Sequence, residues 1–520
     1  MLWACLLLPS LPLDVFARAA SPADAAKPFA VGSGGRTPRI VSANAAARAA
    51  GIHPGQLVSA ALALAPDLLL RDRDPGAEST ALAAVATWAT QFTPAIALAP
   101  PDAVLAEIGG SLRLFGGLPQ LMARLARGVL DLGYAARFAL APTSTAALLF
   151  ARAETTDGYR LSGTLAGKTG AMVQRAPAPE FAAVPMPDPQ AWLDALFPLP
   201  LALTEANPAA VATLAAAGIT SFGQACALPR AALARRVGED FVALLDRARG
   251  LIPELRPLFV PPPRYAGKLD LPAPVTSVDA LAFAVNRLVL ELAGWLTGRG
   301  LGITEMSLAL AHERYVRVAT GVPTTTVGFA LAVPAREPAH LVAVLRERLA
   351  RVVLPAPVEA ITLASEATAP LASRNLGLLP GDEAAATVPL LDRLRARLGE
   401  GAVTLVAPHA EHRPERAWRN GKIGDRPRFP GTAEAACKTW SVPRPVWLLA
   451  EPEPLGHRLE AQPWVLRDGP ERIESGWWDG VDVRRDYFVA ENPRGETVWI
   501  YRDHRYGIDD GEWFLHGVFA

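Results

Sequence analysis

The chain has 520 residues, of which 51% are hydrophobic and 20% are charged, and its formal net charge is zero. This length predicts several domains, the composition excludes a chain that is disordered overall, and the zero net charge argues against a surface that attracts polyanions everywhere. The three cysteines, Cys5, Cys226 and Cys437, lie far apart and form no CxxC pair. They indicate no disulfide framework, which fits a reducing cytoplasm.

The first stretch of interest is the apolar run of residues 2–8, which Pro9 ends. A continuous apolar run closed by a breaker predicts a strand that is buried on both faces. A signal peptide is the alternative, but no Lys or Arg precedes the run, and Asp14 and Arg18 follow soon after it. No other stretch approaches the roughly 18 uninterrupted apolar residues of a membrane span, so no membrane is expected as a partner.

A series of short elements follows, with an Ala-rich helix first and Asn44 as a helix cap. The expected helices are 14–26, 45–50, 81–90, 118–132 and 143–151, and the expected strands are 39–42, 95–98, 103–108 and 135–141. Together with the first strand, the order strand, helix, two strands, helix, strand predicts a split βαβ sheet.

Two runs within this region carry a family resemblance. Residues 41–55 resemble the fingers segment of Y-family (lesion-bypass) DNA polymerases, and residues 109–117 resemble their second palm motif. The resemblance implies a right-hand fold with a ferredoxin-like palm. Arg48 matches the family's triphosphate-binding arginine, whereas Ala45 stands where the family has a tyrosine. Arg48 is therefore interpreted as a remnant of a nucleotide site; taken alone, it is typical of a solvated helix arginine.

The resemblance also implies metal-binding carboxylates at two places. The first falls at Leu8, Pro9 and Ser10, and the second, an Asp-Glu pair, falls at Ala99 and Pro100. None of these residues is a carboxylate, and two-metal phosphoryl transfer requires such ligands. No catalytic residue, metal or cofactor is therefore expected. The alternative is an active polymerase that uses three nearby acids, namely Asp14, Asp102 and Glu107.

A helix, a tight turn and a second helix predict a helix-hairpin-helix motif after a Pro-rich linker. In such hairpins, backbone N–H groups at the turn meet a DNA phosphate. Between residues 230 and 264 there are seven Arg against four Asp and Glu, a local balance of 7 − 4 = +3. The block resembles the Y-family thumb. The predicted DNA-binding residues are Gly218, Ile219, Thr220, Arg230, Arg235 and Arg236.

The next block alternates strands with two helices, 278–297 and 338–352, and resembles the Y-family little finger. Any ferredoxin-like module is the alternative. The fold class is thus an α+β multidomain hand with a mostly β C-terminal region. The expected domains are a palm (1–20 and 78–165), fingers (21–77), a linker and thumb (166–262), a little finger (263–368), a linker with a short helix (369–412) and a Trp-rich region (413–520).

The C-terminal region holds eight of the twelve tryptophans and ends in alternating strand-like runs. Residues 413–444 contain eight Lys and Arg against three Asp and Glu, with aromatic residues between them. This segment is either a loop that contacts nucleic acid or a flexible surface segment.

The resemblance is strongest to a catalytically degenerate branch of the Y family. It implies a DNA-binding scaffold in damage-induced translesion synthesis, associated with the nucleoid. The implied partners are primer-template DNA, a sliding clamp, an error-prone C-family polymerase and a RecA-like accessory protein. The predicted clamp-binding residues, which resemble a Gln-Leu-x-Leu-Phe peptide in an exposed linker, are Asn375, Leu376, Leu378 and Leu379.

Two other motifs point to different chemistry. Residues 162–169 nearly match a phosphate-binding loop and would make the chain a nucleotide hydrolase through Lys168. The preceding residues predict no good strand, and such a loop needs a strand before it and a helix after it. His409 and His412 are too close for a helix-borne zinc pair, and no third ligand is evident.

Overall fold

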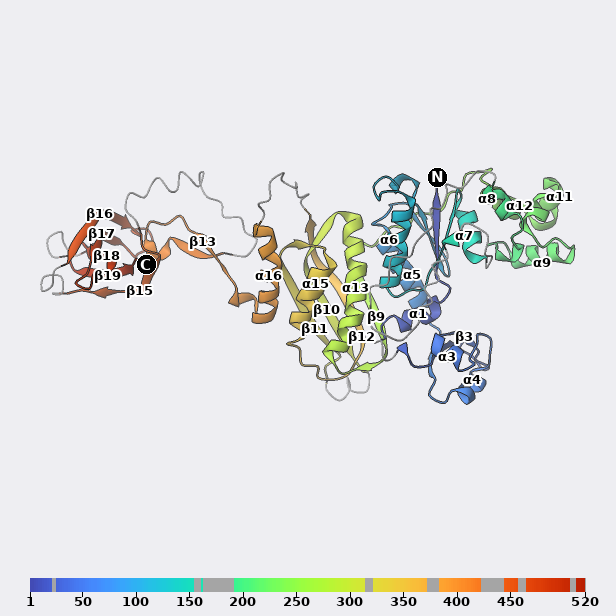
Figure 1. Cartoon of the computed structure of the whole chain (residues 1–520), viewed down its shortest axis with the longest axis horizontal. Helices are drawn as coiled ribbons and strands as arrows, with labels where there is room; N and C mark the ends of the chain where they lie inside the picture. The colour runs from blue at the N-terminus through green and yellow to red at the C-terminus, as the bar shows by residue number, and fades with distance from the viewer. Residues whose placement is uncertain are drawn as a thin grey trace. The chain divides into compact units, whose positions relative to one another are not determined.

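The structure is a computed structural model that describes residues 1–20, 25–153, 160–161, 191–313, 321–371, 383–421, 444–456, 464–505 and 511–519. The chain forms two compact units, Met1–Arg397 and Leu398–Ala520 (Figure 1). Each unit is described separately below.

The first unit is built around a five-stranded antiparallel palm sheet in the order β5-β6-β1-β7-β8. Its strands are β1 (Trp3–Leu7), β5 (Ile96–Ala99), β6 (Ala103–Glu107), β7 (Arg137–Ala141) and β8 (Arg160–Leu161). Residues Cys5 and Leu7 of β1 pack into one core, and Ala4 and Leu6 pack into the other. The prediction of a strand buried on both faces is therefore confirmed.

Helices cover both faces of the palm sheet. They are α1 (Leu11–Ala17), α5 (Pro75–Ala89), α6 (Leu118–Asp131) and α7 (Ser144–Arg152). Apolar residues of α5 and α6 share a core with one face of β1, and those of α7 share the core on the other face. The first helix starts three residues earlier than predicted, because Pro12 lies in its first turn, where proline needs no N–H partner.

A small fingers region is inserted between α1 and α5. It contains β2 (Phe29–Gly32), β3 (Ile40–Ala43), α3 (Ala45–Ala49), α4 (Val58–Leu64) and β4 (Leu69–Asp72), with the strand order β3-β2-β4. The side chain of Asn44 accepts a hydrogen bond from the Ala47 N–H at 2.8 Å. This bond satisfies a free donor at the helix start, so the predicted cap is confirmed.

The thumb region follows as a group of short helices. They are α8 (Ala191–Leu196), α9 (Pro208–Ala216), α10 (Phe222–Cys226), α11 (Arg230–Val237) and α12 (Glu239–Ala248). Buried residues such as Leu214, Phe222 and Leu245 belong to the same core as Leu7 of the palm. The thumb helices therefore pack onto one face of the palm sheet.

The little finger is a second antiparallel sheet in the order β11-β10-β12-β9. Its elements are β9 (Ala266–Val275), α13 (Val278–Arg299), β10 (Leu301–His312), β11 (Thr324–Ala335), α15 (Pro338–Leu349), β12 (Val358–Pro370) and α16 (Glu383–Leu398). In the palm, the first strand of the chain is central, whereas here the first strand lies at an edge. The little finger is therefore not a second copy of the palm topology.

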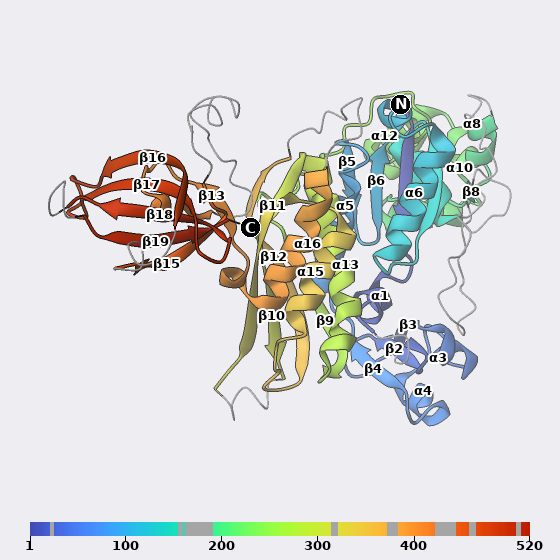
Figure 2. The same ribbon diagram turned by 60° about the vertical axis from the view of Figure 1, so that its left-hand side comes forward.

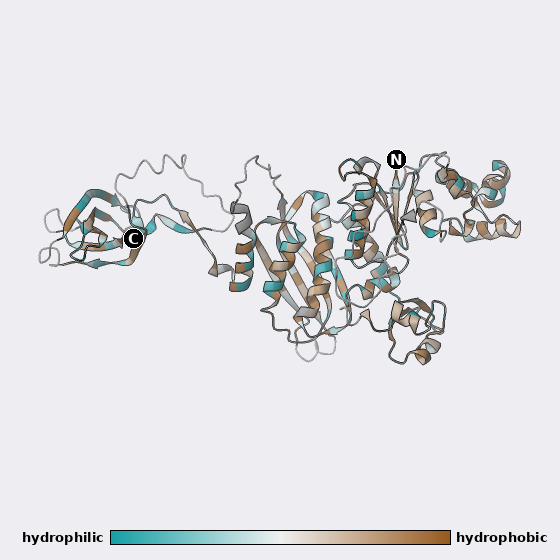
Figure 3. Cartoon of the chain, in the orientation of Figure 1, coloured by the Kyte–Doolittle hydropathy of each residue, from teal (hydrophilic) through white to brown (hydrophobic). Residues whose placement is uncertain are grey.

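Three helices, α13, α15 and α16, lie on one face of the little-finger sheet (Figures 1 and 2). Apolar and polar residues alternate around α13 and along the neighbouring strands (Figure 3). Within the described chain, residues 280–299 of α13 form the one helical segment that is long and apolar enough to cross a membrane. Leu281, Leu288 and Leu292 of this helix are fully buried in the little-finger core, so α13 is a core helix.

The second unit is rich in β-structure. A hairpin of β13 (Leu405–Pro408) and β14 (Trp418–Gly421) precedes a five-stranded sheet in the order β15-β19-β18-β17-β16 (Figure 2). These strands are β15 (Trp447–Pro454), β16 (Val465–Ser475), β17 (Val483–Glu491), β18 (Thr497–Asp503) and β19 (Trp513–Val518). Tyr487 stacks on Trp499 at a ring distance of 4.0 Å in its core. Strand β17 begins at Val483, because residues 477–480 before it form a turn.

Candidate nucleic-acid interface

The carboxyl end of β1 is where the family resemblance predicts a metal-binding aspartate. The Leu8 N–H donates to the Asp102 carbonyl at 2.7 Å, so the two strand ends that match the family's metal site lie side by side. Leu8 is fully buried, and Ser10 starts helix α1. At the positions that match the metal-binding aspartate by resemblance, namely Leu8, Pro9 and Ser10, the structure thus presents no carboxylate.

The three acids of the alternative active site do not converge. Leu7 pairs with Ala103 and Trp3 pairs with Glu107, so Asp102 lies beside one end of β1 and Glu107 beside the other. Five residues of strand separate these acids by about 17 Å. The two metals of a phosphoryl-transfer site lie about 4 Å apart and share their ligands. Asp102 and Glu107 are too far apart to do so.

Each of these acids has a local partner. One Asp102 oxygen lies 3.8 Å from the Arg152 guanidinium. Burial raises the pKa of Asp102 above its ordinary value, and Arg152 acts in the opposite direction. Glu107 accepts the Leu2 N–H at 2.9 Å and the Gly109 N–H at 3.1 Å, so it fixes the start of β1.

Asp14 lies on the other side of β1. Its carboxylate accepts the Ala135 N–H at 3.1 Å, just before β7. Strands β6 and β7 flank β1, which separates them by about 10 Å. Among the described residues, no group of three or more His, Cys, Asp and Glu side chains is placed to hold a metal ion.

The proposed nucleotide remnant, Arg48, lies exposed on α3. Its guanidinium donates to the Ala43 carbonyl at the end of β3. This contact orders the side chain locally and leaves its other donors available. The assignment of Arg48 to nucleotide binding stays a prediction.

The predicted helix-hairpin-helix turn joins α9 to α10, and Gly218 adopts φ +77° at its tip. The Gly218 and Ile219 N–H groups donate to carbonyls of α9. The Thr220 N–H donates to the Gln224 side chain at 2.9 Å, as part of a capping box with Ser221. All three predicted amides therefore have partners within the fold, and a phosphate would have to compete with Gln224 for Thr220.

The three predicted thumb arginines lie in two different environments. Arg230 forms an ion pair with the buried Asp246 and so ties α11 to α12. Arg235 and Arg236 lie in the last turn of α11 and are both exposed. Within the described chain, no ion pair joins either of them to a carboxylate. Arg235 and Arg236 are thus the better candidates for phosphate contacts.

Several other predicted features fall outside the described residues. These are the clamp-like residues Asn375, Leu376, Leu378 and Leu379, and the phosphate-loop-like segment with Lys168. In the second unit, Glu411 lies between the two predicted histidines. It accepts the Arg413 guanidinium at 2.7 Å and serves an ion-pair network rather than a metal.

Two ion pairs of the first unit were not predicted from the sequence. Arg152 was not identified as the partner of Asp102, and the buried ion pair of Arg18 with Glu291 was not foreseen. The latter two residues are separated by 273 positions. Only a three-dimensional arrangement brings them together, so no local pattern could have indicated the pair.

The split βαβ palm, the fingers insert, the helical thumb and the separate little-finger sheet define a Y-family polymerase hand. A family model described as the impB/mucB/samB family matches residues 14–152. Protein ImuB from two strains of Caulobacter vibrioides is 32% identical over 511 residues, covering 90% of this chain and 100% of each relative. The chain belongs to the ImuB family.

The chain is also similar to solved structures. The crystal structure of DinB from Sulfolobus solfataricus matches 70% of this chain and 98% of its own, with 15% identity and a TM-score of 0.35. A post-insertion binary complex of Dbh DNA polymerase matches the same shares, with 15% identity and a TM-score of 0.37.

Proposed function

We propose that this chain is a polymerase-shaped DNA-binding scaffold in damage-induced translesion synthesis and has no polymerase activity of its own. The observation that carries the proposal is the carboxyl end of β1. Leu8 is buried there, and the nearby acids Asp102 and Glu107 belong to opposite ends of β6. Without clustered carboxylates, the site lacks the means to hold two cations at the attacking and leaving oxygens.

The DNA-binding part of the proposal depends on the thumb. Arg235 and Arg236 are exposed at the end of α11 and can neutralise phosphates. The little-finger sheet contributes less positive charge. The charged side chains on the sheet face that the helices leave uncovered include the positive Lys268 and the negative Asp270, Glu305 and Glu366. Binding should therefore centre on the thumb.

The family relation supports a role in mutagenesis and repair. We infer that the chain links a sliding clamp, an error-prone C-family polymerase and a RecA-like accessory protein. The clamp contact is assigned to Asn375–Leu379, and the C-terminal unit is available for other proteins. The relation to ImuB and the peptide-like sequence after the little finger support this part of the proposal.

Primer extension with purified protein, Mg²⁺ and nucleotides tests the absence of activity. We expect no incorporation, from the wild type or from Asp102→Ala, while binding to the same primer-template persists. Incorporation that Asp102→Ala abolishes would overturn the scaffold proposal in favour of an active polymerase. Phosphate release that is lost in Lys168→Ala would instead support a nucleotide hydrolase.

A further inference from the structure

The palm and the little finger meet along a closely packed pair of helices. Helix α13 of the little finger lies against α5 of the palm. A Cβ atom on Gly294 would come within 2.5 Å of the Trp88 ring, and one on Gly298 within 2.4 Å of the Thr90 hydroxyl. Real Cβ atoms do not approach so closely, so the two glycines allow this contact. We call this contact the α5–α13 seam.

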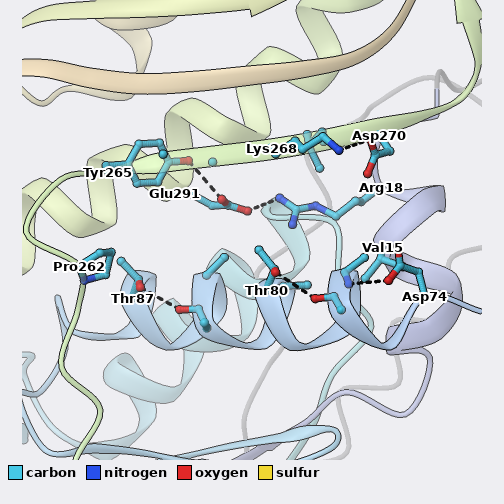
Figure 4. Close-up of a pocket in the computed structure, with 18 of the residues that line it drawn as sticks. Val15, Arg18, Asp74, Thr80, Thr87, Pro262, Tyr265, Lys268, Asp270 and Glu291 are labelled. Atoms are coloured by element: carbon cyan, nitrogen blue, oxygen red, sulfur yellow. Dashed lines mark hydrogen bonds and ion pairs between the residues drawn. The ribbon is translucent and has the colours of Figure 1, made fainter. Parts of the chain in front are cut away.

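A buried ion pair lies beside the seam (Figure 4). Arg18, just after α1 of the palm, donates to Glu291 of α13 and to the Tyr134 hydroxyl. The Arg18 and Glu291 side chains are only 4% and 3% exposed. The Tyr265 hydroxyl lies 3.2 Å from the second oxygen of Glu291 and donates to the Leu288 carbonyl at 3.0 Å. Both charges are thus enclosed and hydrogen-bonded.

Residues 249–265 connect the thumb to the little finger, and we call them the tether. The tether is hydrogen-bonded to the palm and to α13 at several points. The Phe259 N–H donates to the Ile96 carbonyl of β5 at 2.7 Å. The Arg256 guanidinium donates to the Ser144 hydroxyl at 2.8 Å, and the Trp295 indole donates to the Pro262 carbonyl at 3.0 Å. The tether therefore does not act as a free linker between two independent modules.

We propose that Arg18 and Glu291 are positioning residues that lock the little finger onto the palm, with Gly294 and Gly298 providing the close contact. Breaking a buried ion pair leaves an unpaired charge in the interior, which opposes any shift along the seam. The two sheets are then held in one arrangement before DNA arrives. The lock between the little finger and the palm does not depend on the proposed function. Any effect of the lock on DNA binding rests on the proposed function.

The test is hydrogen exchange of the full chain, without DNA, in the wild type and in Glu291→Gln, which keeps the shape but removes the charge. We expect amides of α13 and α5 at the seam to exchange on the order of 100-fold faster, the effect of losing one member of a buried ion pair. Amides in the central strands β1 and β10 should keep their protection. Glu347→Gln, which removes an exposed ion pair with Arg393, is the matched control and should change nothing.

A second pair of variants covers the case in which Glu291→Gln fails to fold. Gly294→Ala should accelerate exchange at the seam, whereas Gly328→Ala should not, because no atom lies within 4 Å of a Cβ at Gly328. Unchanged exchange at the seam, or equal acceleration in β1 and β10, would overturn the lock. A chain that keeps the lock but does not bind primer-template DNA would refute the proposed function and leave this inference standing.

Discussion

At the scale of single residues, Asp14 shows how burial changes the pKa of an acid. It is buried beside Arg18 and Arg287, and its carboxylate accepts the Ala135 N–H. Burial raises the pKa of Asp14 to about 7 from an ordinary value of 3.8, although the Ala135 N–H and both arginines lower it. Between these two values, the folded chain binds more protons than the unfolded chain. The free energy of unfolding should therefore fall as the pH rises from about 4 to about 7.

Asp14→Asn should remove this contribution, because an amide can accept the same hydrogen bond without a charge. At pH 8 the variant should be more stable than the wild type by up to about 4 kcal/mol, since one pKa unit corresponds to about 1.4 kcal/mol. At pH 4 the two should be nearly equal. Calorimetric unfolding of both proteins at the two pH values measures the difference. Asp131→Asn, on the exposed end of α6, is the control and should keep the pH dependence of the wild type. If Asp14→Asn also kept that pH dependence, the assignment to Asp14 would be refuted.

At the scale of elements, the thumb hairpin is held by its own cap. The Gln224 side chain accepts the Thr220 and Ser221 N–H groups, at 2.9 and 3.1 Å. Gln224→Ala should destabilise α10 by about 1 kcal/mol. DNA affinity should not fall, because Gln224 competes with a phosphate for these donors. Hydrogen exchange in α10 and a binding titration test both points, with Gln120→Ala on α6 as the control. A large loss of affinity would mean that Gln224 itself contacts DNA.

The end of α11 gives a second prediction. Arg235→Ala combined with Arg236→Ala should weaken primer-template binding to a similar extent for all sequences. It should also reduce the slope of log affinity against log salt by about 2, since two phosphate contacts are lost. Titrations at several salt concentrations give this slope. Arg124→Ala with Arg127→Ala removes the same charge from α6 and should leave the slope unchanged. If the two double variants behave alike, the thumb is not the binding surface.

Much of the first unit could be predicted from periodicity and caps. Residues 118–132 were expected as a helix, and α6 spans Leu118–Asp131. Other boundaries depended on packing that a local pattern does not encode. Helix α16 spans Glu383–Leu398 and contains Pro389 in its interior, whereas a proline is locally typical of a helix start. Its Asp392 accepts the Ala332 N–H, so tertiary contacts with β11 help to define the helix. Strand β12 reaches Pro370, because β10 pairs with it that far, and this pairing is not encoded in a local pattern.

The candidate site was harder to predict than the fold. The absence of carboxylates at Leu8 and Pro100 could be read from the sequence, because it depends on residue identity alone. The separation of Asp102 from Glu107 could not, since it follows from the pairing of β1 with β6. The cap that occupies the hairpin amides, by contrast, had a sequence signal that was missed, because Ser221 and Gln224 have the spacing of a capping box.

At the scale of the whole molecule, the proposed clamp contact would bring the scaffold to a replication site. Leu376→Ala with Leu379→Ala should abolish binding to purified clamp and leave DNA binding intact, because a few apolar anchors dominate such contacts. A titration against the clamp measures this. Leu390→Ala with Leu398→Ala is the matched control, since these leucines are exposed on α16. Clamp binding undiminished in the first double variant would place the contact elsewhere.

The buried Leu8 has a consequence for the history of the chain. Clustered carboxylates repel one another, so an active site usually costs stability, and residues freed from catalysis tend to drift toward better packing. Leu8 now belongs to a core with Leu6 and Leu11. Returning an aspartate to this position would bury a charge among apolar side chains, without metal ions to neutralise it. Under the proposed scaffold function, a single substitution at Leu8 would therefore not restore a metal site, because the new carboxylate would lie unpaired in an apolar core.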